Sequence, residues 1–214
     1  MRYNPHMLLQ LLVNGSGNFA ANIFVFLLVA VALVISISIH EFSHAYIANK
    51  LGDPTAKNMG RITLDPRAHL DPMGTILLLV AGFGWGKPVP FDPRFLQNPK
   101  RDSAIISLAG PASNITLAIL LSLIFHMFGL GGITGLFVRL AIQYNLVLAI
   151  FNLIPVHPLD GFKVVNGLLP QELSYQWIQL APYGMWILLL LIFGGITEQI
   201  IGPTLIWGMK ILGF

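Results

Sequence analysis

The stretch FVFLLVAVALVISISI, residues 24–39, contains no charged side chain, and HEFSH, residues 40–44, follows it directly. A helix that crosses the roughly 30 Å of bilayer hydrocarbon needs about 20 apolar residues. The apolar pattern begins near Phe19 and continues in helical register through the polar residues until Gly52 and Pro54 end it. The stretch therefore predicts a membrane-spanning helix with two histidines and a glutamate near its end.

The composition extends this prediction to the whole chain. Of its 214 residues, 55% are hydrophobic and only 10% are charged, whereas soluble domains carry about 25% charged residues. No polar block is long enough to form a separate soluble domain of ~100 residues. The net charge of +3 suits contact with anionic lipid headgroups and does not indicate a nucleic-acid partner. We expect a single membrane-embedded domain over residues 1–214, in contact with the lipid bilayer.

Further apolar segments indicate the number of spans. Two more firm spans are expected over residues 103–130 and 133–155, and a fourth over roughly 177–196. Residues 73–85 are apolar over only about 13 residues, which suits a re-entrant segment better than a full crossing. The tail 203–214 is too short to cross unless it continues the preceding helix. The predicted fold is an all-α polytopic membrane protein with about four to six transmembrane helices.

One short stretch departs from the helical pattern. RITL, residues 61–64, favours β structure and lies in a polar segment punctuated by prolines. We therefore expect a short membrane-associated β element near the bilayer surface.

The distribution of positive charge favours a re-entrant segment at 73–85. Eight of the twelve Lys and Arg residues lie between Lys50 and Arg101. If residues 73–85 do not cross, all eight share one side of the membrane, and the positive-inside rule makes that side cytoplasmic. If residues 73–85 crossed the membrane fully, four of these eight positive residues would lie on the outer side. The expected location is therefore the cell membrane, with the first span running from the outside to the inside.

The HEFSH stretch has the spacing of a metal site. His40 and His44 lie one turn apart on one face of the predicted helix, close enough to bind one Zn²⁺. Glu41 is offset and can address a water molecule, as the general base does in the H-E-x-x-H motif of zinc peptidases. Lys50 lies ten residues beyond His40, roughly 15 Å along the axis. His40 is therefore expected inside the membrane boundary, where ionisable groups are costly and usually functional. This depth favours a metal site over polar residues that merely reach the headgroups.

A catalytic zinc site needs a third protein ligand and an open position for water. Asp160 qualifies, because the third span is expected to reach the cytoplasmic side close to it and beside the end of the first span. The metal site and the charge rule thus favour the same topology. Pro155 and Pro158 interrupt the helix here. Backbone freed in this way is tolerated at membrane depth only when it is buried in protein or lines a water-filled cavity, and hydrolysis requires such a cavity.

Three motifs in one order resemble a known family. HEFSHA at 40–45, LAGPASN at 108–114 and NLIPVHPLDG at 152–161 resemble the site-2 protease family of intramembrane zinc metalloproteases. DPRAHLDPMGT at 65–75 and GWGKPVPFDPR at 84–94 resemble a compact prokaryotic subgroup that has no PDZ or nucleotide-sensing domain. The resemblance covers nearly the whole chain.

The resemblance implies a set of site residues. It implies His40, His44 and Asp160 as ligands of one Zn²⁺ ion. It also implies Glu41 as the catalytic acid and base, and Asn152 as a group that steadies the oxyanion or the substrate backbone. The active site would lie nearer the cytoplasmic side of the membrane.

The implied activity is hydrolysis of peptide bonds in or near transmembrane segments of other proteins, as in regulated intramembrane proteolysis. A substrate helix must unwind before attack, and residues 61–64 could hold the unwound segment by β-addition. A different reading is a membrane protein that binds or transports metal without hydrolysis. Glu41 distinguishes hydrolysis from metal binding or transport, because a transport site needs no acid or base outside its metal ligands. The intact ligand set argues against a third reading, an inactive chaperone.

Other polar residues leave alternatives open. Asn114 either has a direct role beside the site or forms hydrogen bonds between helices. His157 is either a loop residue or a group next to the metal, and His69 is expected to form a structural hydrogen bond. His126 and Arg139 are expected near the far boundary, away from the site. The sequence names neither the substrate nor the oligomeric state.

Overall fold

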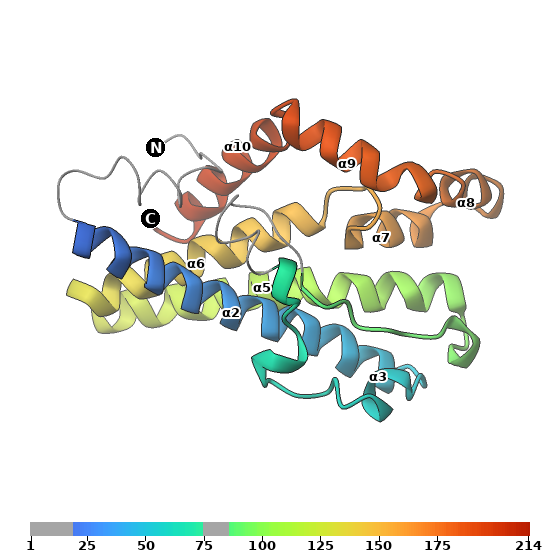
Figure 1. Cartoon of the computed structure of the whole chain (residues 1–214), viewed down its shortest axis with the longest axis horizontal. Helices are drawn as coiled ribbons and strands as arrows, with labels where there is room; N and C mark the ends of the chain where they lie inside the picture. The colour runs from blue at the N-terminus through green and yellow to red at the C-terminus, as the bar shows by residue number, and fades with distance from the viewer. Residues whose placement is uncertain (1–18, 75–85) are drawn as a thin grey trace.

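Three long helices lie side by side and form the core of the computed structural model, which describes residues 19–74 and 86–214 (Figure 1). They are α2 (Phe19–Lys50), α5 (Pro99–Phe128) and α6 (Gly132–Asn152), and each packs against the other two. Together they position most of the residues predicted to act chemically.

Helix α2 confirms the first predicted span and its polar continuation. It runs without interruption through the apolar stretch and the H-E-x-x-H motif, and it ends at Lys50. Gly52 follows with a φ of +107°, a backbone conformation that L side chains rarely adopt and that glycine accepts.

Helix α5 confirms the second predicted span, but it starts before residue 103 and ends at Phe128, two residues before the predicted end. Pro99 occupies the first turn, where its missing N–H costs no hydrogen bond. The buried carboxylate of Asp102 accepts a hydrogen bond from the backbone N–H of Asn98 at 2.9 Å and so stabilises this start. The helix passes through Pro111 and ends at Phe128, and the next residue, Gly129, caps it with a φ of +57°.

Helix α6 confirms the third predicted span and ends at Asn152. Pro155 and Pro158 lie in the turn that follows, so the chain leaves the helix there. It then enters the short helix α7 (Asp160–Leu168), which packs against α5.

The C-terminal part forms a second layer across α6 (Figure 1). Helix α8 (Gln171–Ile178), the 3₁₀ turn η3 (Ala181–Tyr183) and α9 (Gly184–Phe193) follow one another closely. Gly195 separates α9 from α10 (Ile196–Ile211), which packs against α6. The apolar cluster beneath α10 contains Ala118, Val138, Ile142, Leu146 and Leu205.

Four helical stretches among the described residues are long and apolar enough to cross a membrane. They are α2, α5, α6 and the stretch 171–193, which confirms an all-α polytopic membrane protein. The predicted tail 203–214 belongs largely to α10, which is not among these four. The predicted re-entrant segment 73–85 lies mostly outside the described residues.

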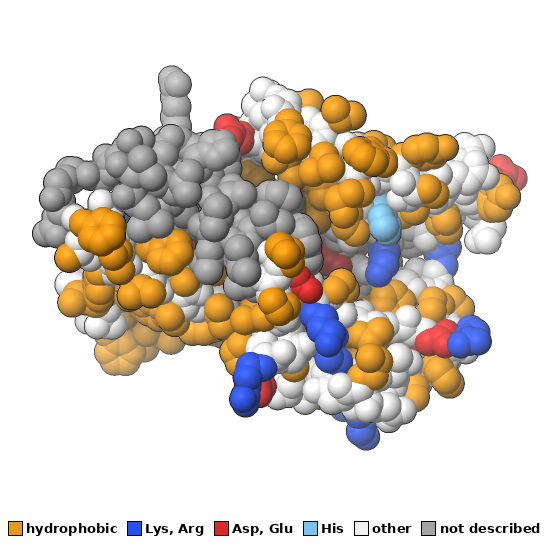
Figure 2. All heavy atoms as spheres, viewed as in Figure 1, with side chains coloured by type: hydrophobic (Ala, Val, Ile, Leu, Met, Phe, Trp, Pro, Cys, Tyr) orange, Lys and Arg blue, Asp and Glu red, His pale blue; other side chains and the backbone are white. Residues whose placement is uncertain are grey.

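The polar connection between α2 and α5 contains α3 (Thr55–Asn58) and the 3₁₀ turns η1 (Pro66–Ala68) and η2 (Pro93–Phe95). On the face shown in Figure 2, Lys and Arg side chains gather at this end of the molecule, away from the beginning of α2.

The predicted strand at residues 61–64 is wrong, because these residues belong to no strand and the chain bends at residues 62–63. The carbonyl of Thr63, which a β ladder would use, accepts a hydrogen bond from the imidazole Nε2 of His69 at 2.7 Å. Within residues 19–74 and 86–214, β pairing is limited to one antiparallel bridge between Leu70 and Gly86.

Candidate metal centre

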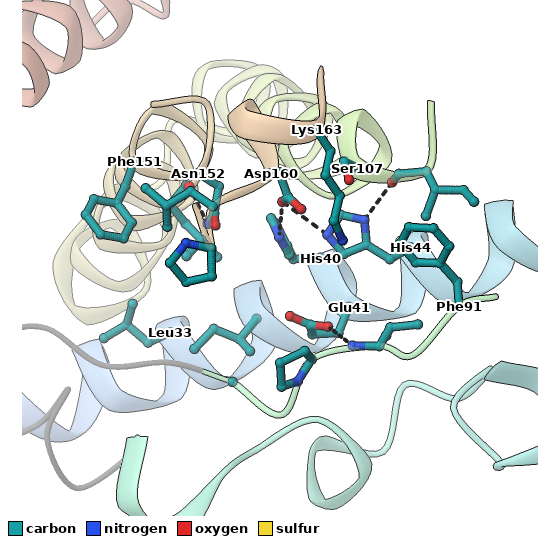
Figure 3. A pocket seen from close by; sticks show the side chains of 18 residues that line it. Leu33, His40, Glu41, His44, Phe91, Ser107, Phe151, Asn152, Asp160 and Lys163 are labelled. Carbon is teal, nitrogen blue, oxygen red and sulfur yellow. Dashed lines mark hydrogen bonds and ion pairs between the residues drawn. The ribbon is translucent and has the colours of Figure 1, made fainter. Parts of the chain in front are cut away.

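Two imidazoles from α2 face the beginning of α7. His40 and His44 lie one turn apart, with ring centroids 4.6 Å from each other, and both are buried. Asp160, the first residue of α7, points its carboxylate at both rings (Figure 3). The prediction that Asp160 would meet the two histidines in space therefore agrees with the structure.

The three side chains have the spacing of a metal site. The Asp160 Oδ2 atom lies 3.1 Å from His40 Nε2 and 3.2 Å from His44 Nε2. The candidate ligand atoms of the three residues all lie within 4.8 Å of one another. Ligand atoms around a tetrahedral zinc ion, each about 2.0–2.1 Å from the metal, lie about 3.3 Å apart. A small shift of these side chains would therefore admit one zinc ion.

Hydrogen bonds on the far side of each ring fit a metal site as well. His44 Nδ1 lies 2.7 Å from the carbonyl oxygen of Ile106, and His40 Nδ1 lies 2.6 Å from the amide oxygen of Asn114. Because a carbonyl oxygen can only accept, each Nδ1 carries the proton and donates it. The Nε2 atoms, on the other side of each ring, both face Asp160 Oδ2, and in the neutral form that binds zinc each would present its lone pair to the metal. The residues present therefore fit a zinc ion.

Asp160 is held as an anion. Burial alone would raise its pKa, but the interaction with His44 and the hydrogen bonds from both imidazoles outweigh burial and hold the pKa below its ordinary value. Its position at the beginning of α7 also favours negative charge, because the N-terminus of a helix carries partial positive charge. An ionised carboxylate is the form that binds a metal.

Glu41 lines the same pocket but is not one of the three clustered groups. Its carboxylate points away from Asp160, toward the chain segment that contains Val89 (Figure 3). Its Oε2 atom accepts a hydrogen bond from the backbone N–H of Val89 at 3.2 Å.

Asn152 also lines the pocket, at the last position of α6. Its Nδ2 donates one hydrogen bond to the carbonyl oxygen of Leu148 at 2.9 Å. An amide nitrogen carries two protons, so this bond does not use its whole donor capacity.

The pocket has a volume of about 220 Å³ and is open on one side. Helices α2, α5, α6 and α7 and the segment 86–91 all contribute to its lining. Its remaining lining residues include Leu33, Ile37, Pro88, Phe91, Ser107, Phe151 and Lys163.

Gly110 is a site residue that sequence reasoning missed. A Cβ atom built on Gly110 would lie only 2.5 Å from His44 Nε2 and 2.6 Å from His40 Nε2. The absence of a side chain therefore allows α5 to approach both imidazoles. Its place next to Pro111 in the LAGPASN motif was the available signal.

Lys163 was also missed. It lies one turn after Asp160 on α7, and its Nζ atom lies 4.5 Å from the ring centroid of Phe91. Burial lowers the pKa of Lys163, although Asp160 and Glu41 raise it in part. The spacing of three residues from Asp160 was the only sequence signal.

The remaining polar residues considered in the sequence analysis differ in whether they belong to the metal centre. Asn114 touches His40 directly. His157 does not belong to the clustered metal-ligand group found among the described residues, and its ring packs against Phe162. His126 bonds to the carbonyl oxygen of Leu212 and Arg139 stacks on aromatic rings, both outside the pocket lining.

Comparison with known families gives a match over half of the chain. The model of peptidase family M50 matches residues 28–137. This range includes the H-E-x-x-H motif and LAGPASN and ends before Asp160. No solved structure matches the chain significantly.

Curated relatives are similar over most of the chain. A candidate zinc metalloprotease of Bacillus subtilis, YwhC, is 42% identical over 184 residues, which are 82% of this chain and 84% of the relative. A candidate zinc metalloprotease of Mycolicibacterium smegmatis, Rip2, is 31% identical over 82% of this chain and 69% of the relative. The zinc metalloprotease MJ0392 of Methanocaldococcus jannaschii is 26% identical over 68% of this chain and 35% of the relative.

Proposed function

Because this chain belongs to peptidase family M50, we propose that it is an intramembrane protease that hydrolyses peptide bonds in or near the transmembrane segments of other membrane proteins. The family membership makes it a zinc metallopeptidase and confirms the resemblance to site-2 proteases. The observation that carries the proposal is the group of His40, His44 and Asp160 in a pocket that Glu41 enters without joining the group.

In this proposal His40, His44 and Asp160 hold one zinc ion. Bound zinc supplies Lewis acidity, which polarises the scissile carbonyl and makes a water molecule more acidic. The Nδ1 hydrogen bonds of the two rings and the ionised carboxylate of Asp160 fix the three donors toward one point.

Glu41 acts as the general base and acid. Its carboxylate takes a proton from the attacking water and returns it to the leaving amine. The bond from Val89 N–H holds one carboxylate oxygen, which leaves the other oxygen to meet the water. Asn152 donates its remaining amide proton to the developing oxyanion or to the substrate backbone.

The chemistry of the reaction requires an unwound substrate. The carbonyl groups of an intact α-helix are engaged in the hydrogen bonds of the helix itself. The substrate helix must therefore unwind before its carbonyl reaches the site. The proposed role is thus in regulated intramembrane proteolysis, with a transmembrane protein as the substrate.

The active site lies nearer the cytoplasmic side of the cell membrane in this proposal. The support is the concentration of positive charge between Lys50 and Arg101. The chain has no cysteine, so a single cysteine at Lys57 or Gly131 can be labelled unambiguously. An impermeant maleimide should label Gly131→Cys in intact cells and Lys57→Cys only after lysis. The reverse pattern would contradict the orientation.

The catalytic proposal is tested by Glu41→Gln. The variant should retain about one zinc per chain, because Glu41 is not a proposed ligand, and it should lose cleavage of a co-expressed transmembrane substrate by about 10³-fold or more. Zinc content is measured on purified protein and cleavage by gel. The matched control is Glu172→Gln, which removes the same charge at an exposed position of α8 and should cleave normally.

The same experiment separates the non-proteolytic alternative. A protein that only binds or transports metal has no use for a base outside its ligands, so Glu41→Gln would then leave function intact. Undiminished cleavage by this variant would refute the assigned role of Glu41. Wild-type protein that takes up no zinc would refute the metal centre itself.

A further inference from the structure

The two imidazoles of the metal centre are oriented by different kinds of acceptor. His44 donates to a backbone carbonyl, that of Ile106, which belongs to a regular helix and cannot turn around. His40 donates to a side-chain amide, that of Asn114. An amide has an acceptor end and a donor end, so the orientation of Asn114 decides what His40 can do.

The orientation of Asn114 is fixed by its other hydrogen bonds. Its Nδ2 donates to the carbonyl oxygen of Ser36 at 3.1 Å and to the amide oxygen of Asn145 at 2.8 Å. A flipped amide would turn Oδ1 toward these two acceptors and Nδ2 toward His40. Three hydrogen bonds would be lost together, in a place where Asn114 is completely buried.

Asn145 is oriented in the same way from α6. Its Nδ2 donates to the carbonyl oxygen of Ala141 at 2.8 Å, and its side chain is almost completely buried. Its Oδ1 therefore faces Asn114. The polar network of Asn145, Asn114 and His40 crosses α6, α5 and α2, and every partner in it is a donor facing an acceptor.

From this geometry we propose that Asn114 is a positioning residue for the metal centre and that Asn145 sets the orientation of Asn114. Together they hold His40 with its proton on Nδ1, so that Nε2, which lies 3.1 Å from Asp160 Oδ2, is the ring atom that would bind zinc. The inference rests on the proposed metal ligands. It adds Asn145 to the site and explains what keeps the acceptor oxygen of Asn114 turned toward His40.

A purely structural role makes a different prediction. If Asn114 only joins helices, its bonds to Ser36 and Asn145 are what matter, and every substitution that removes them should be harmful to a similar degree. If Asn114 acts through His40, a replacement that keeps an acceptor for His40 Nδ1 should preserve metal binding. The variants Asn114→Asp and Asn114→Leu distinguish these cases. Both remove the amide protons that bond to Ser36 and Asn145, but only aspartate keeps an oxygen that can accept the hydrogen bond from His40 Nδ1.

The experiment compares the zinc affinity of wild type, Asn114→Asp and Asn114→Leu by competition with a chelator, on full-length protein in detergent. Asn114→Leu should bind zinc about 10–100-fold more weakly, and Asn114→Asp should remain within about fivefold of wild type. Ser122→Ala is the matched control. It removes a hydrogen bond from the same helix α5 to the carbonyl of Leu212, outside the network, and should leave zinc affinity unchanged.

A second measurement reports the proton position without activity or metal. In metal-free protein labelled with ¹⁵N-histidine, the His40 signals should show a protonated Nδ1 in wild type and in Asn114→Asp. Asn114→Leu should shift the proton toward Nε2. If Asn114→Leu does not fold, Asn145→Leu provides the test, with an expected loss of zinc affinity of about 3–10-fold.

The outcomes separate the inference from the proposed function. Wild-type protein without zinc affinity would overturn the metal centre. Wild-type protein that binds zinc, with Asn114→Leu binding as tightly or with the Asp and Leu variants weakened equally, would overturn the positioning role alone. Unchanged affinity in Asn145→Leu would remove Asn145 from the network.

Discussion

The pocket has two walls that are built differently. The helical wall, formed by α2, α5 and α7, holds the candidate ligands through buried hydrogen bonds between regular helices. The extended wall, residues 86–91, contains no helix and provides the backbone N–H that meets Glu41. A zinc ion and a peptide substrate make different demands, and each wall suits one of them.

The helical wall suits the metal. Zinc requires donor atoms at a fixed distance, so its ligands must be held tightly by their surroundings. The extended wall suits a peptide, because backbone outside a helix or sheet has hydrogen-bonding groups that can pair with an unwound chain. Disturbing the first wall should remove the metal, whereas disturbing the second should leave the metal and slow the reaction.

The largest effect is expected from Gly110→Ala in the helical wall. The new methyl group would lie about 2.5 Å from both imidazoles, closer than carbon and nitrogen atoms can approach. Since α5 and α2 are packed together at this point, either the rings or the helices must move. We expect zinc affinity to fall by about 100-fold or more and cleavage to be lost. Zinc content after dialysis and chelator competition measure the effect.

The control for this prediction is Gly202→Ala in α10. A Cβ atom at Gly202 meets no atom of the described residues 19–74 and 86–214 within 4 Å, and alanine favours a helix over glycine by about 1 kcal/mol. This variant should therefore bind zinc and cleave normally, with equal or greater resistance to heat. Normal zinc affinity in Gly110→Ala would mean that the two helices separate at little cost, which would contradict a rigid helical wall.

The helical wall was also the wall that the sequence predicted best. The span of α2 and the one-turn spacing of His40 and His44 follow from local periodicity, which a single sequence displays. Asp160 could be reached as well, because the charge rule brought its end of α6 to the same side of the membrane as His44. The resemblance to a family supplied the rest of the expected set, including Asn152.

Contacts between distant segments could not be predicted in this way. The close approach of Gly110 to the imidazoles depends on how α5 packs against α2. The hydrogen bond from Asn114 to Asn145 depends on how α5 packs against α6. No local pattern encodes either. The strand expected at residues 61–64 failed for the same reason. Its local preference for β structure was real, but the side chain of His69 occupies the Thr63 carbonyl.

An intermediate effect is expected from Arg61→Met, which disturbs the extended wall. Arg61 is buried and donates to the carbonyl oxygens of Pro88 at 3.0 Å and of Lys87 at 2.5 Å. These bonds place the next residue, Val89, against Glu41. Losing them should lower kcat/KM by about 10–100-fold, the equivalent of about 1.5–3 kcal/mol for bonds to a charged group. Zinc content should not change.

The matched control is Arg94→Met. Arg94 follows the extended wall, and its ion pair with Asp92 involves an arginine side chain that is 88% exposed. Exposed ion pairs contribute little, so this variant should keep kcat/KM within about twofold of wild type. If Arg61→Met loses zinc as readily as Gly110→Ala, the two walls are not independent and the comparison fails.

The smallest effect is expected from Lys163→Met, because Lys163 joins the two walls. It belongs to α7, and its ammonium group lies over the ring of Phe91 in the extended wall. Methionine keeps much of the apolar stem and removes the charge. The cation–π contact, worth about 1 kcal/mol, is lost together with the attraction of Lys163 to Asp160 and Glu41. We expect unchanged zinc content and a fall in kcat/KM of about 3–10-fold, with Lys163→Arg close to wild type.

A double-mutant cycle with Phe91→Leu shows whether this contact is what connects the walls. If it is, Phe91→Leu should lower kcat/KM to a similar degree, and the double variant should be little worse than either single variant. Independent losses that simply add would show that Lys163 acts on the substrate or on Glu41 and not through Phe91. The extended wall would then be held in place by Arg61 without help from α7, which would make the two walls more separate than the contact between them suggests.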